Sequence, residues 1–161
     1  MKLWACAAAA MLLLGSSPAA AQPAQESELS AEETAAASAI PDAFLERVRS
    51  GNGAAAISQA FAGTMMEYQT AQLQALISYL DTLTDYYGSV TGWELGRRET
   101  FTSRLVRQTY LVFTDNGPFV ATFDLYRRPT GWMLQRISLH DRTQDLFHQT
   151  PTPTQELTTE N

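Results

Sequence analysis

The sequence has little of several residue types on which metal sites and covalent cross-links depend. It contains one cysteine, Cys6, and two histidines, His140 and His148. A single cysteine excludes a disulfide within the chain. The two histidines form neither a His-x-x-His nor a His-x-Glu spacing, so they provide no metal-binding motif. We therefore expect no bound metal and no cofactor.

Catalytic signature loops are missing as well. No Gly-rich phosphate loop follows a predicted strand, and no serine lies in a Gly-x-Ser-x-Gly elbow. Arg97-Arg98 and Arg127-Arg128 are candidate anion-binding pairs, but nearby acids or turn positions favour solvated arginines. No motif in the chain fixes a reaction. Whether the protein is an enzyme therefore stays open, with a non-catalytic role favoured.

The long hydrophobic run of the chain is confined to its first residues. Lys2 precedes an apolar stretch over residues 3–14, which is too short to cross a bilayer comfortably, and small residues follow up to Ala21. This pattern predicts a signal peptide over residues 1–21, cleaved after Ala21. The mature protein would then be periplasmic or secreted, with no stable membrane anchor. The alternative, a lipoprotein modified at Cys6, leaves almost no hydrophobic segment before the cysteine.

Charge is distributed unevenly along the chain. The formal net charge is −6, yet positions 41–147 hold ten arginines against eleven acids. The excess acid lies in the flanking segments, and this pattern argues against a nucleic-acid partner. Both flanks also lack large apolar side chains. We predict a disordered acidic Ala-rich tail over 22–39, one domain over 40–147, and a disordered Thr/Pro tail over 148–161.

Apolar side chains at helical spacing predict three helices, over residues 41–49, 54–62 and 65–87. Pro41 suits the first turn of the first helix. Thr64 followed by Glu67 is a capping box for the third helix, and Gly88 is its C-terminal stop.

From Val90 onward the period becomes two, which predicts four strands, near 90–99, 102–115, 118–128 and 132–141. Asn116-Gly117 predicts a two-residue hairpin turn, and Pro129-Thr130-Gly131 predicts a three-residue loop with a bulge. These turns set a register that pairs Val112 with Ala121, Tyr110 with Phe123, Tyr126 with Leu134 and Asp124 with Arg136.

This register gives the predicted sheet two different faces. One face is nearly all apolar and should lie under the helices: Tyr110, Val112, Phe119, Ala121, Phe123, Leu125, Ile137 and Leu139. The other face mixes Trp132 and further apolar residues with Arg107, Asp124 and Arg136. Five of its residues predict a homodimer interface, because they form a larger apolar patch than monomers usually expose: Leu111, Phe113, Val120, Tyr126 and Leu134. The alternative is a monomer whose curvature and tails shield this face.

The order of three helices and a curved sheet, with Tyr87-Gly88 after the long helix, points to a known group. Tyr126-Arg127-Arg128-Pro129 and Gly131-Trp132-Met133-Leu134 then form the last hairpin. Over roughly 40–140 the chain resembles small exported bacterial members of the nuclear transport factor 2-like group. The resemblance implies an α+β cone with three helices packed on a curved four-stranded antiparallel sheet. The group includes isomerase-like and cyclase-like enzymes, non-catalytic binding modules, and dimers formed through the open sheet face.

Three residues are candidates for catalysis: Asp124, His140 and Tyr110. Asp124 would be a general base if burial raised its pKa, but an ion pair with Arg136 and Arg107 would lower the pKa, and we favour that pair. Our leading hypothesis is an exported non-catalytic module that binds an unknown ligand. The alternative is a small cofactor-independent isomerase-like or cyclase-like enzyme, using Asp124 or His140 with Tyr110 or Tyr126.

Five residues are candidate contacts for a small-molecule ligand: Trp93, Tyr87, Arg107, Tyr126 and Arg136. Trp93 and Tyr87 lie where the third helix meets the first strand, which in a cone is near the pocket mouth. Core packing explains these two aromatic residues more simply.

Overall fold

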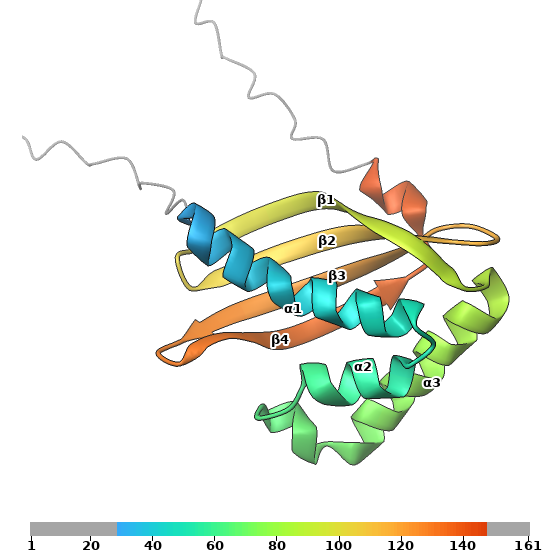
Figure 1. The fold of residues 1–161 in the computed structure, drawn as a ribbon, viewed down its shortest axis with the longest axis horizontal. Helices are drawn as coiled ribbons and strands as arrows, with labels where there is room; N and C mark the ends of the chain where they lie inside the picture. The colour runs from blue at the N-terminus through green and yellow to red at the C-terminus, as the bar shows by residue number, and fades with distance from the viewer. Residues whose placement is uncertain (1–28, 148–161) are drawn as a thin grey trace, which may run out of the picture.

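The computed structural model describes residues 29–147, which form an α+β fold with the helices first. The helical part comprises α1 (Ala31–Arg49), α2 (Gly53–Ala60), the 3₁₀ helix η1 (Met65–Tyr68) and α3 (Thr70–Tyr87). The strands are β1 (Val90–Thr102), β2 (Leu105–Thr114), β3 (Phe119–Arg128) and β4 (Gly131–His140), and the 3₁₀ helix η2 (Thr143–Leu146) follows. The strands form one antiparallel sheet in the order β1-β2-β3-β4. The predicted fold class is confirmed, and Figure 1 shows α1 running across one face of the sheet.

Helix α1 begins about ten residues earlier than predicted, so the interpretation of residues 31–39 as a disordered tail is wrong. Ser30 Oγ accepts a hydrogen bond from the Glu33 amide at 3.2 Å, and Glu33 Oε2 accepts one from the Ser30 amide at 3.0 Å. This capping box starts the helix, and Ala37 is completely buried. The segment lacks large apolar side chains, but its small alanines allow α1 to approach the sheet closely. The predicted signal peptide, residues 22–28 and the tail at 148–161 lie outside the described residues.

The predicted third helix is divided into two parts at Gln69. Thr64 Oγ1 accepts from the Met66 amide, and the Glu67 carboxylate accepts from the Gly63 amide at 2.7 Å. The predicted box therefore caps the short η1 turn instead of the long helix. Among residues 29–147, no helix has the length and apolar character that crossing a membrane requires.

The loop between β2 and β3 is longer than the predicted two-residue turn. Such a turn needs a positive φ at both central residues, whereas only Gly117 has one, of 153°. The Asn116 amide instead donates to the Tyr87 carbonyl at 2.8 Å, and the Ser89 amide donates to Asp115 Oδ2 at 2.9 Å. The pairing is displaced by two residues, so Val112 lies opposite Phe119. An even displacement leaves each side chain on its predicted face.

The β3–β4 hairpin has the predicted bulge at a different position. Arg128 pairs directly with Gly131, and the register shifts between Asp124 and Leu125 instead. Asp124 is opposite Arg136 as predicted. Between the bulge and the turn, however, Leu134 pairs with Leu125 and Trp132 with Arg127. Both Leu134 and Trp132 therefore lie on the helix-covered face, contrary to the prediction that placed them on the other one.

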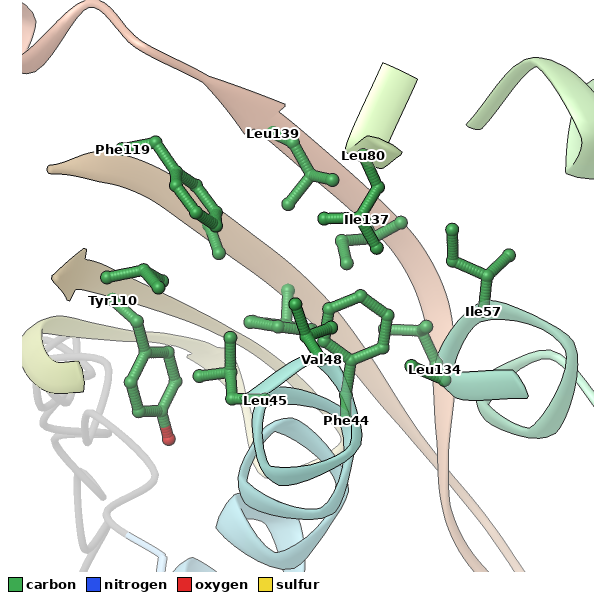
Figure 2. Packing of buried hydrophobic residues seen from close by; sticks show 14 of the residues in the cluster. Phe44, Leu45, Val48, Ile57, Leu80, Tyr110, Phe119, Leu134, Ile137 and Leu139 are labelled. Atoms are coloured by element: carbon green, nitrogen blue, oxygen red, sulfur yellow. The ribbon is translucent and has the colours of Figure 1, made fainter. Parts of the chain in front are cut away.

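The core fills the space between α1 and the sheet. All eight residues of the predicted apolar face are buried, and Figure 2 shows Phe44, Leu45 and Val48 of α1 among them. Phe44 meets Phe123 edge to face, with ring centroids 5.4 Å apart. Ile57 of α2 and Leu80 of α3 complete the same cluster.

Candidate functional site

The sheet face that α1 does not cover, called the open face below, carries a pocket of about 330 Å³. Its principal lining residues come from all four strands and from η2: Arg97, Glu99, Arg107, Thr109, Leu111, Val120, Thr122, His140, Asp145 and Leu146. After β4 ends, η2 supplies part of the pocket wall. A short C-terminal turn that no periodicity predicted therefore helps to make the hollow.

The floor of this pocket combines two hydroxyls with aliphatic side chains. Thr109 of β2 lies opposite Thr122 of β3, and their Oγ1 atoms are 3.3 Å apart in a hydrogen bond. A bond between two hydroxyls uses one of their two protons as a donor, so one proton is left for another acceptor. Val120 is fully buried and Leu111 partly so. The floor can therefore contact both a polar and an apolar part of a ligand.

The charged side chains around the pocket have partners within the fold. The nitrogen–oxygen distances are 3.7 Å for Arg97–Glu99, 2.7 Å for Arg107–Asp124 and 3.3 Å for Arg142–Asp145. The carboxylates and guanidiniums that line the pocket are thus balanced without a ligand. A charged ligand would have to compete with these existing ion pairs.

Asp124 is held by two arginines, as the ion-pair interpretation predicted. Arg107 donates to both carboxylate oxygens, at 2.7 and 3.1 Å, and Arg136 donates to Oδ2 at 3.0 Å. The hydrogen bonds from Arg107 hold the pKa of Asp124 below its usual value, against the opposing effect of burial. An ionised carboxylate whose oxygens are occupied is poorly suited to take a proton from a substrate. Asp124 adjoins the pocket through a second hollow of about 370 Å³, which shares Glu99 and Arg107 with it.

The other two catalytic candidates lie on opposite faces of the sheet. His140 lines the open-face pocket, and its Nδ1 is buried without a hydrogen-bond partner among residues 29–147. Tyr110 is on the helix-covered face, where its hydroxyl donates to Gln108 Oε1 at 3.0 Å. Burial, and then the charge of Asp42, raise the pKa of Tyr110 to about 12. Tyr110 therefore cannot act in one site with His140 or Asp124.

The five candidate ligand contacts also separate into two groups. Arg107 lines the pocket, and Tyr126 and Arg136 lie on the same face; the Tyr126 hydroxyl accepts from Arg104 at 3.1 Å. Trp93 instead packs on the helix side, where its indole donates to Asp42 Oδ1 at 3.2 Å.

Tyr87 is tied to the end of the sheet. Its hydroxyl donates to Asp141 Oδ2 at 3.2 Å, and desolvation raises its pKa. The structure gives Trp93 and Tyr87 contacts within the fold and does not bring them to the pocket.

The predicted apolar interface is smaller in the structure than in the sequence analysis. Leu134 belongs to the core on the helix side, and Val120 is fully buried on the open face beside the pocket. Leu111, Phe113 and Tyr126 remain partly exposed. Three of the five residues are therefore available to a partner.

Sequence reasoning missed the two threonines and the residues of η2. The predicted register placed Thr109 opposite Asp124, so the hydroxyl pair with Thr122 was not visible. The actual loop between β2 and β3 brings these two threonines together. To predict the floor of the pocket, the length of the β2–β3 loop would have to be known, because it sets the pairing of the two threonines.

Comparison with known proteins gives one structural likeness. No family model and no curated protein matches the sequence. Among solved structures, the chain is similar to one from Campylobacter jejuni that is titled a "Putative NTF2-like transpeptidase". The two share 12% identity over 65% of this chain and 97% of the other, with a TM-score of 0.45. The order of helices before a four-stranded antiparallel sheet agrees with the predicted fold class. No residue role is carried over from this likeness.

Proposed function

We propose that the protein is an exported, non-catalytic binding module that holds a small uncharged polar molecule in the pocket of the open face. The observation that carries this proposal is the composition of the pocket. It offers hydroxyls and an imidazole, while its carboxylates and guanidiniums already have partners. Its volume of about 330 Å³ lies within the range of small-molecule sites.

The proposed ligand is uncharged because the pocket contains no excess charge to attract an ion. Binding an anion would draw Arg107 away from Asp124, and binding a cation would draw Glu99 away from Arg97. Either exchange replaces one ion pair by another and yields little net free energy. Hydrogen bonds to the threonines and to His140, together with contact with Leu111 and neighbouring aliphatic groups, require no such exchange.

A non-catalytic role is favoured because the best candidate base is neutralised by two arginines. The alternative, a small cofactor-independent isomerase-like or cyclase-like enzyme, is left with His140 as the candidate base that lines the pocket. The two functions differ in a measurable way, because an enzyme converts the molecule that it binds.

The test compares small molecules retained by the protein after purification from its own export compartment, using native mass spectrometry. We expect a molecule of a few hundred daltons on the wild-type chain. A Thr109→Val, Thr122→Val double variant should lose it, and a Thr91→Val control, which removes an exposed threonine outside the pocket, should keep it. Wild-type protein without any ligand, or a double variant that retains it, would contradict the proposal.

The catalytic alternative is examined with the same molecule. Incubation with the wild-type chain should return it unchanged. If it is converted, and if His140→Asn stops the conversion while binding persists, the protein is an enzyme and the non-catalytic proposal fails.

We propose export from the pattern of residues 1–21. Residues 1–28 lie outside the described part of the chain. Sequencing of the mature protein should begin at Gln22. Recovery of the uncut chain, or of a lipid-modified chain beginning at Cys6, would contradict this proposal.

A further inference from the structure

A second groove, of about 360 Å³, lies on the helical side of the molecule, between α1, α2 and the β3–β4 hairpin. Most of its lining residues have apolar side chains, with Ile40 and Phe44 from α1, Ala56 and Ala60 from α2, and Met133 and Leu134 from β4, but Phe44, Ala56 and Leu134 are almost completely buried beneath it. Arg47 and Arg128 also line it, and no acidic residue does. Its chemistry therefore differs from that of the charge-balanced pocket on the open face.

Six arginines of the described residues have a carboxylate partner, and the two arginines of the groove do not. Arg128 donates from Nη1 to the Gly63 carbonyl at 3.3 Å, and its Nε is buried without a hydrogen-bond partner within residues 29–147. Arg47 donates to the Ala43 carbonyl at 2.8 Å. In the described part of the chain neither arginine forms an ion pair. The adjacent Arg127, in contrast, is paired with Glu33 of α1.

These contacts leave two positive charges beside an apolar surface. A guanidinium that has lost water at one nitrogen and has gained no acceptor there attracts an anion more strongly than a fully hydrated one. Its planar array of donors matches a carboxylate, which it can bind through two parallel hydrogen bonds. Apart from the two arginines, the lining residues with polar side-chain atoms are Gln59 and Trp132.

We infer that this groove is a second binding site, specific for an organic anion with an apolar body. Arg128 and Arg47 hold the carboxylate, and the aliphatic or aromatic body lies against the partly exposed side chains of Ile40, Ala60 and Trp132. This site goes beyond the proposed function, because it lies on the other side of the sheet and selects a charged ligand. Its occupancy is independent of the pocket that contains His140.

The test uses octanoate and 1-octanol, which share a chain length and differ in charge. Isothermal titration calorimetry on the full chain should show saturable binding of octanoate and weaker binding of octanol. Arg128→Gln should weaken octanoate binding about tenfold or more, because it removes a charge-assisted pair, and should change octanol binding less than about twofold. The control Arg142→Gln, which removes an exposed arginine just before η2, should leave both affinities unchanged.

A second variant tests the shape of the groove without touching its charge. Ala43 is an exposed helical residue that lines the groove, so Ala43→Met should fill it with little effect on the core. Both probes should then bind more weakly, while the melting temperature stays the same. Absence of saturable octanoate binding, or an octanoate affinity that neither Arg128→Gln nor Ala43→Met reduces, would overturn the inference. So would an equal loss of octanoate and octanol binding in Arg128→Gln.

Discussion

The role of Asp124 depends on two opposing effects on a single carboxyl group. Burial raises a carboxyl pKa, and hydrogen bonds from cations lower it. The predicted register placed Asp124 opposite Arg136, and this pairing is observed because the bulge between Asp124 and Leu125 offsets the shorter turn. The predicted register placed Arg107 two positions away from the residue opposite Asp124, whereas in the structure Arg107 pairs directly with Asp124 at 2.7 Å. The sequence therefore identified the participants, and the loop length decided how closely they meet.

Replacing Asp124 should reveal this network through its pH dependence. Because the pKa of the folded carboxyl is lowered, its stabilising contribution is fully present above its usual pKa of 3.8 and is lost as the pH falls through the folded value. We expect Asp124→Asn to lower the free energy of unfolding at pH 7 by about 1–2 kcal/mol, a modest value because solvent reaches both arginines and screens the ion pairs. Urea unfolding at several pH values checks this. If the free energies of unfolding of the wild type and of Asp124→Asn still differ by the same amount well below pH 3.8, the ion-pair explanation is contradicted.

At the scale of elements, helix α1 shows what hydrophobic periodicity cannot detect. Its C-terminal half was predicted from large apolar residues such as Phe44, whereas its N-terminal half docks through Ala37 and a polar contact. Ser38 Oγ accepts hydrogen bonds from Gln108 Nε2 and from Arg98, both at 3.1 Å. Gln108 is completely buried on the helix-covered face. A long-range polar contact of this kind leaves no periodic signal in the sequence.

Removal of the Ser38 hydroxyl should therefore destabilise the protein although alanine favours helix. Ser38→Ala leaves the buried amide of Gln108 without an acceptor, and we expect a loss of about 1–3 kcal/mol in the free energy of unfolding. Ser78→Ala is the matched control, because Ser78 is exposed in the middle of α3. Thermal unfolding, monitored by circular dichroism, measures the stability of both variants. Equal stability of the two variants would show that the Ser38 contact contributes nothing.

The two hairpin loops show why local turn signals predicted the sheet incompletely. Asn116-Gly117 favours a tight turn by itself, but the Tyr87 carbonyl and the Ser89 amide bind the loop residues and hold a wider loop. These partners lie more than twenty positions away in the sequence. In the second hairpin the bulge moved into the strand, which carried Leu134 and Trp132 to the other face. In spite of both errors, the strand order and the eight residues of the predicted apolar face are as predicted.

For the whole molecule, the remaining question is what contacts the open face. The fold buries Val120 and Leu134, so of the five predicted interface residues only Leu111, Phe113 and Tyr126 are partly exposed. The proposed ligand pocket opens on this same face. A second copy of the chain packed here would cover the pocket mouth, so dimer formation and ligand exchange would then be coupled.

We retain the homodimer as a proposal and predict that light scattering at micromolar concentration gives twice the mass of the chain. Phe113→Glu should yield the monomer mass, because it places a charge within the apolar part of the open face. Tyr68→Glu is the control, since Tyr68 is 79% exposed on η1, away from the sheet. A dimer that Phe113→Glu leaves intact would place the interface elsewhere. A monomeric wild-type chain would exclude the dimer, and the open-face pocket would then be accessible to its ligand in every copy.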